Sequence, residues 1–147
     1  VQMNNILRFL QRKHLTPDIS AEDEAVMGVA LESAEDWRGK YLTMIYGHRM
    51  SDESVATFTE QATNFSQMFD SWLERRGTDY LCGAEPTVAD YSLFCVVDDT
   101  VRTVTTLLDE RPLLAAFYAR MQARAGVAAY LGSNPEHRER VNGNGLG

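Results

Sequence analysis

The chain has 147 residues, 44% of them hydrophobic and 24% charged, a balance typical of a folded domain with its own core. Its 14 basic and 21 acidic side chains give a net charge of −7, which argues against nucleic acid or an anionic membrane surface as a partner. No apolar run approaches the roughly 20 residues that cross a membrane, so we expect no membrane partner.

The first helix is expected over residues 1–14, where apolar side chains recur at helical spacing and basic ones gather towards the end. It starts without an N-terminal cap, so we expect that an upstream part precedes it in the natural protein. Pro17 ends the helix, and we place the domain boundary here, between residues 1–15 and residues 16–147.

Two long helices come next. Ser20 predicts the start of a helix that runs to about Gly47, because three carboxylates fill its first turn. Ser51 predicts the start of another in the same manner, which ends at about Gly77. Since only a short turn joins them, we expect these two helices to pack antiparallel.

The most apolar segment predicts a central core helix over residues 87–108. Thr87 and Asp90 form a predicted capping box at its start, in which the side chain of each residue accepts the backbone N–H of the other. A fifth helix is expected over residues 111–125, with a last short turn over residues 127–131. No stretch of useful length alternates with the two-residue period of a strand, so the predicted fold class is all-α.

The residues alone do not assemble a complete active site. The three histidines lie far apart, and no cluster of histidine, cysteine and carboxylate has metal-ligand spacing, so no metal is expected. Cys82 and Cys95 are interpreted as reduced thiols in or near the core of a cytoplasmic protein. Asp36 and its acidic neighbour read, by default, as part of a solvated helix face.

Three separated segments nevertheless carry motifs in a recognisable order. Residues 2–8 read Gln-Met-Asn-Asn-Ile-Leu-Arg, and residues 35–46 contain Glu-Asp-x-Arg-x-Lys-Tyr followed by Ile-Tyr. Residues 133–145 contain Ser-x-Pro-Glu-His and then Asn-Gly-Asn-Gly. Together with the capping box, they resemble the cytosolic glutathione transferases, most closely the pi class, with the mu and sigma classes next.

The resemblance implies a particular division of the chain. Residues 1–15 would be the last helix of the thioredoxin-like α/β half of such a transferase, and residues 16–147 would be its all-α C-terminal domain. Most of the thioredoxin-like half is then missing from this sequence. The residue that activates the glutathione thiol would lie upstream, so no catalytic residue is assigned in this stretch.

The resemblance also implies site residues. Gln2, Met3 and Asp36 match glutathione-binding positions; Met3 stands where the family has a serine, which removes a hydroxyl donor to the γ-glutamyl carboxylate. Asp36 would reach across a dimer interface to the γ-glutamyl ammonium of the partner's glutathione. The positions that match the pocket for the hydrophobic electrophile are Leu42, Tyr46, Asn142 and Gly143.

The function implied is that of a cytoplasmic, homodimeric glutathione transferase. Its reaction would be attack of the glutathione thiolate on a hydrophobic electrophile, as in detoxification, with glutathione as co-substrate. Two alternatives stay open: a non-catalytic relative used as an assembly or structural module, and a glutathione-dependent isomerase.

Overall fold

The computed structural model describes residues 2–16, 18–135 and 142–146, and within these ranges all regular structure is helical, as predicted. Its elements are α1 (Met3–Leu10), η1 (Gln11–Leu15), α2 (Ala21–Leu42), η2 (Thr43–Gly47), α3 (Asp52–Arg76), α4 (Val88–Thr103), α5 (Pro112–Ala123) and α6 (Ala125–Ser133). The two η elements are short π-helical turns that prolong α1 and α2. No helix in the described part of the chain is long and apolar enough to span a membrane.

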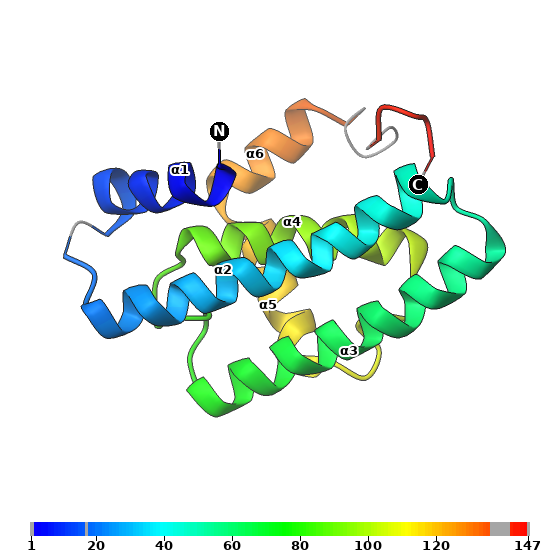
Figure 1. Cartoon of the computed structure of the whole chain (residues 1–147). Helices are drawn as coiled ribbons and strands as arrows, with labels where there is room; N and C mark the ends of the chain where they lie inside the picture. Colours follow the sequence, from blue (N-terminus) through cyan, green and yellow to red (C-terminus); the bar gives the residue numbers. More distant parts are fainter. Residues whose placement is uncertain (1, 17, 136–141, 147) are drawn as a thin grey trace.

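The helices form layers around α4. α2 crosses directly against α4, and α3 runs antiparallel to α2, as the short connection between them predicted (Figure 1). In Figure 1, α1, α6 and the described C-terminal residues 142–146 lie on the opposite side of α2 from α3, with α1 over the first half of α2 and residues 142–146 near its last turn. The candidate site residues near the two ends of the chain, Gln2 and Met3 at one end and Asn142 and Gly143 at the other, therefore lie on the side of the bundle opposite α3.

The core is built from the apolar faces of α2, α3, α4 and α5. Trp37 is completely buried and stacks on Phe65 and Phe69, with ring centroids 5.7 Å and 6.2 Å away. Stacked aromatic rings of this kind stabilise a core beyond the area that they bury. The largest fully buried side chains are Trp37, Tyr41, Phe58, Phe69, Phe117, Met27, Leu31, Met44, Ile45, Leu81, Leu93 and Leu114.

The predicted starts of α2 and α3 are confirmed. The Ser20 hydroxyl accepts the Asp23 N–H at 3.0 Å, and the Ser51 hydroxyl accepts the Ser54 N–H at 3.3 Å. α3 ends at Gly77 with φ = 61°, a left-handed conformation that glycine adopts at no steric cost. These signals are local, which is why the sequence is sufficient to place them.

The central helix is shorter than predicted. α4 ends at Thr103, not at residue 108, and residues 105–110 form turns. Residues 103–106 are Thr-Val-Thr-Thr, four β-branched side chains in a row, which lose rotamer freedom in a helix and whose hydroxyls compete for backbone partners. The fifth helix also ends early, at Ala123, because Arg124 is extended; the predicted last turn is the longer α6.

Candidate functional site

The first turn of α1 carries the first two candidate glutathione residues. Gln2 is the N-cap of α1, and its carbonyl accepts the N–H of Asn5 at 3.2 Å. Gln2 and Met3 are both exposed and line a surface hollow of about 320 Å³, whose other side is formed by Glu32 and Glu35 of α2. The side chain of Gln2 forms no cap hydrogen bond with the first turn of α1.

Met3 has a cationic neighbour. The Arg38 guanidinium donates to the Met3 sulfur at 3.5 Å, a weak hydrogen bond, and the same Nη1 lies 3.7 Å from a Glu35 carboxylate oxygen. A positive charge therefore lies beside the position from which the expected serine hydroxyl is absent.

Asp36 is exposed on α2 and does not share the hollow of Gln2 and Met3. It lines a second, open hollow of about 680 Å³ together with Arg8, Gly28 and Val29. Glu32 borders both hollows, which places them side by side on the outer face of α1 and α2. The structure thus brings Gln2 and Met3 together and leaves Asp36 on an adjoining surface that includes the exposed Val29.

The C-terminal tail is fastened to the end of α2 by a set of hydrogen bonds. The Asn142 side chain is buried and donates to the Tyr41 hydroxyl at 2.9 Å. The Gly143 N–H donates to the Tyr46 hydroxyl at 3.1 Å. The Asn144 side chain donates to the Ile45 carbonyl at 3.0 Å. Residues nearly 100 positions apart in the chain therefore form one local site.

The π-helical turn η2 is the element that presents this site. In it the His48 N–H reaches back to the Thr43 carbonyl, and the Met50 N–H to that of Met44. Arg49 and Met50 then adopt φ values of 51° and 54°, a left-handed conformation that is strained for residues with a side chain. π-turns of this kind are frequent at functional sites.

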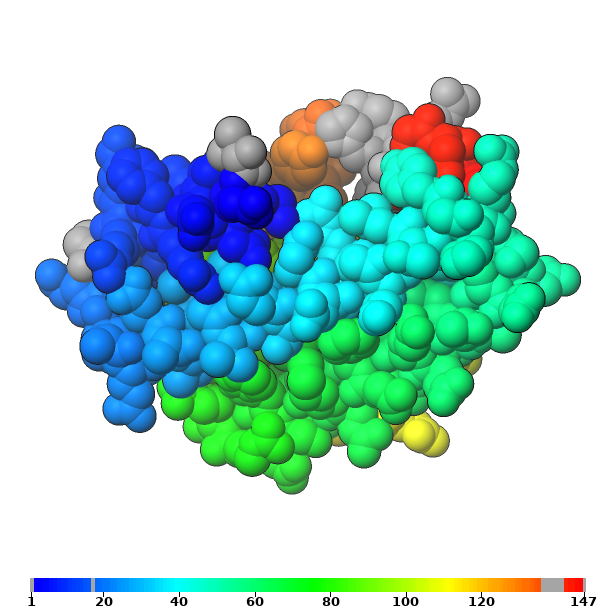
Figure 2. Space-filling model, in the orientation of Figure 1, coloured from blue at the N-terminus to red at the C-terminus, as the bar shows by residue number. Residues whose placement is uncertain are grey.

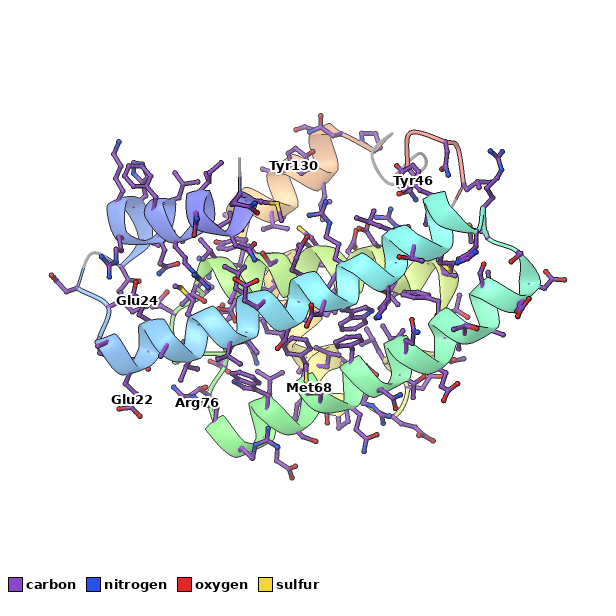
Figure 3. The ribbon with its side chains drawn as sticks, viewed as in Figure 1. Glu22, Glu24, Tyr46, Met68, Arg76 and Tyr130 are labelled. Carbon is purple, nitrogen blue, oxygen red and sulfur yellow. The ribbon has the colours of Figure 1, made fainter. Side chains whose placement is uncertain are left out.

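Tyr46 is the most accessible member of the group, with 51% of its surface exposed, and lies at the end of α2 beside the tail (Figure 3). Because its oxygen accepts the Gly143 N–H, its own proton stays available for another acceptor. Of the other predicted pocket residues, Asn142 and Gly143 join it through the tail, while Leu42 is half-buried against the core one turn earlier.

The capping box at Thr87 and Asp90 is confirmed and is structural. The Asp90 carboxylate accepts the Thr87 N–H at 2.7 Å and the Thr87 hydroxyl at 2.8 Å, and its other oxygen accepts the Leu81 N–H at 2.8 Å. Complete burial raises the pKa of Asp90, and the hydrogen bonds from Leu81 and Thr87 oppose that rise. Both of its oxygens therefore accept hydrogen bonds from within the fold.

The two cysteines differ. Cys82 is buried, and burial raises the pKa of its thiol to about 11, so it is unreactive at neutral pH. Cys95 is exposed, so the prediction of a core or near-core thiol is wrong for this residue. α4 is apolar over most of its surface, but the side that carries Cys95 is open. Within residues 2–16, 18–135 and 142–146, no group of histidine, cysteine and carboxylate side chains could hold a metal ion.

Two buried or half-buried polar residues escaped the sequence patterns. Asp99 of α4 is half-buried, and burial raises its pKa to about 6 while Arg102 and Arg38 oppose the rise. Gln11 in η1 is completely buried and accepts the N–H of Val88, 77 residues away. Each stands in a segment that reads as a regular helix, and nothing local in the sequence indicates that its side chain turns inward.

The chain is similar throughout its length to glutathione S-transferases. The family model for the C-terminal domain of glutathione S-transferase matches residues 35–134. Glutathione S-transferase P 1 of Bufo bufo is 30% identical over 146 residues, which cover 98% of this chain and 69% of that protein. Glutathione S-transferase P of Homo sapiens is 28% identical with the same coverage.

A solved structure agrees with these sequence relationships. The pi-class glutathione S-transferase of Onchocerca volvulus superimposes with a TM-score of 0.90 at 27% identity, covering the whole of this chain and 71% of that one. The agreement extends over the helical bundle that carries the capping box and the docked tail. The chain therefore belongs to the glutathione S-transferase family, and it carries the helical C-terminal domain of that family in its pi-class-like form.

Proposed function

We propose that the protein conjugates the thiolate of glutathione to hydrophobic electrophiles, as a dimeric cytoplasmic transferase of detoxification. The observation that carries the proposal is Tyr46, whose exposed hydroxyl is oriented by the Gly143 N–H with its proton left free. This arrangement joins an apolar ring to one directed proton donor, which suits an apolar substrate that gains negative charge as it reacts.

In the proposed reaction, the glutathione sulfur forms a bond to an electrophilic carbon while a leaving group departs with its electron pair or an adjacent oxygen takes up the negative charge. Tyr46 donates a hydrogen bond to that developing charge. Leu42, Asn142 and Gly143 line the remaining sides. The residue that lowers the pKa of the glutathione thiol would be supplied by an upstream thioredoxin-like half, of which residues 1–15 are the last helix.

Exposed apolar surface on α1 supports that upstream half. Ile6, Phe9 and Leu10 are exposed by 46%, 62% and 38% on a strongly amphipathic helix. Surface of this kind normally faces another layer of the same protein. On the glutathione side, we assign the Gln2 amide to the γ-glutamyl end and Asp36 to the ammonium group of the glutathione in a second subunit.

The test is turnover of 1-chloro-2,4-dinitrobenzene by the full-length protein with glutathione. We expect conjugation, and we expect Tyr46→Phe to lower kcat/KM for an electrophile that develops oxyanion charge by about tenfold, because one hydrogen bond to the transition state is lost. Binding of glutathione without any turnover would reject the enzymatic proposal.

A second function, a non-catalytic assembly module, is favoured by Met3. The thioether and its Arg38 neighbour replace the hydroxyl expected at the glutathione carboxylate. A stable complex with a different protein, formed equally well with and without glutathione, would support this function, whereas Met3→Ser raising glutathione affinity in an active protein would support the transferase.

A further inference from the structure

Gln11 is the only completely buried side chain of α1 and η1, and it forms two hydrogen bonds. Its Oε1 accepts the Val88 N–H at 2.8 Å, and its Nε2 donates to the Thr16 hydroxyl at 3.1 Å. Val88 is the first residue of α4, so its N–H has no partner inside that helix. Gln11 thus ties the N-terminal segment to the capped end of the central helix.

The other polar contacts of α1 and η1 with the bundle are exposed. Arg8 pairs with Glu32 at 3.0 Å, and Arg12 pairs with Glu24 at 2.6 Å, all four side chains being at least 31% exposed. Ion pairs between exposed side chains contribute little stability and tolerate changes in geometry. They hold α1 beside α2 on the outside of the bundle (Figure 2).

The buried hydrogen bond between Gln11 and Val88 differs from these ion pairs because breaking it costs free energy of folding. If Gln11 moved away, the Val88 N–H would be buried without an acceptor, which costs roughly 1–3 kcal/mol. Gln11 also begins the π-turn, since its carbonyl accepts the Thr16 N–H at 3.0 Å. The backbone of Gln11 therefore sets where α1 ends, and its side chain binds that end of the helix to the start of α4.

We propose that Gln11 is a positioning residue for glutathione: by anchoring the end of α1 on α4, it sets where Gln2 and Met3 present themselves to the ligand. This inference rests on the proposed function. The eight residues of α1 span about 12 Å, so a tilt of about 5° at the anchored end displaces Gln2 by about 1 Å. A displacement of that size in a binding group is sufficient to weaken ligand binding or catalysis strongly.

The experiment compares Gln11→Leu with Gln11→Glu in the full-length protein. Leucine removes both hydrogen bonds at similar volume. Glutamate keeps an oxygen that accepts the Val88 N–H in either protonation state, and the Thr16 hydroxyl can rotate to donate to it. We measure KM for glutathione, kcat at saturating glutathione, the Kd of S-hexylglutathione and hydrogen exchange of the Val88 amide.

We expect Gln11→Leu to raise KM and Kd by about tenfold while kcat stays within about twofold, and to speed exchange of the Val88 amide. Gln11→Glu should restore KM and Kd to within about threefold of wild type. If Gln11→Leu does not fold, Thr16→Val is the milder variant, with a smaller change in the same direction expected.

Wild-type KM and Kd in a folded variant whose Val88 amide exchanges faster would overturn the proposal and leave Gln11 as a helix cap. Failure of Gln11→Glu to restore binding, although it restores protection of the Val88 amide, would do the same. If wild-type protein does not bind S-hexylglutathione at all, the proposed function fails first and the positioning role fails with it, and the two failures are told apart because this one precedes any substitution.

Discussion

Asp99 is a half-buried carboxylate whose titration should be visible in the stability of the protein. Burial raises its pKa to about 6, against about 3.9 in an unfolded chain. The folded state therefore holds the proton more tightly, and this group makes the protein less stable as the pH rises from about 4 to about 6. Asp99→Asn, which cannot ionise, should remove that loss.

We expect the difference in free energy of unfolding between Asp99→Asn and wild type to be constant below about pH 4 and to rise between about pH 4 and 6. Above pH 7 this difference should exceed its acidic value by about 3 kcal/mol. Urea unfolding at a series of pH values measures it. Asp109→Asn, the same charge change at an exposed residue, serves as the control. A difference that does not vary with pH in this range would contradict the prediction.

At the scale of elements, the sequence predicts the start of a helix well where the capping residue lies within a few positions of it. It predicts the start poorly where the capping side chain comes from another helix. Ser20, Ser51 and the Thr87–Asp90 box act within three residues, so their patterns are readable. α5 begins without a side-chain cap of its own. Its N–H groups at Leu113 and Leu114 are accepted by Asp70 of α3, each at 2.9 Å, across more than 40 residues.

Asp70 should therefore act as the N-cap of α5 from another helix. Asp70→Ala leaves two N–H groups at the start of α5 without their acceptor and removes a negative charge from its positive end, so we expect a loss of about 1–2 kcal/mol. Asp70→Asn, which keeps the oxygen, should lose less than half of that. Denaturant unfolding measures both, and equal losses in the two variants would show that packing rather than capping accounts for the effect.

At the scale of the whole molecule, the all-α class and the family were within reach of the sequence, but the geometry of the site was not. Helical periodicity and motif order are properties of neighbouring residues. The contacts that build the site join segments far apart, such as Asn142 with Tyr41 and Gln11 with Val88, at 101 and 77 residues of separation. The second of these contacts comes from a residue of the π-turn η1, and a π-turn follows the same residue pattern as an ordinary helix end.

Within the described residues 142–146 of the C-terminal tail, three hydrogen bonds join the tail to Tyr41, Ile45 and Tyr46, and of these the one from Asn142 to Tyr41 is buried. Removing it should therefore release the tail while the bundle below stays folded, because α2 and its neighbours pack through other residues. We expect Asn142→Ala to speed cleavage of residues after Ser133 by carboxypeptidase by about tenfold, since loss of a buried bond of about 1 kcal/mol or more shifts docking by that order.

The unfolding midpoint of the bundle should change little in Asn142→Ala, because the stability of a terminal segment is local. Asn64→Ala, at an exposed asparagine of α3, is the matched control and should leave cleavage unchanged. Releasing the tail should also break the hydrogen bond from the Gly143 N–H to the Tyr46 hydroxyl, which orients that hydroxyl. Asn142→Ala should therefore reproduce part of the effect of Tyr46→Phe on turnover. Faster cleavage with unaltered turnover would separate the tail from the chemistry and leave Tyr46 to be oriented by η2 alone.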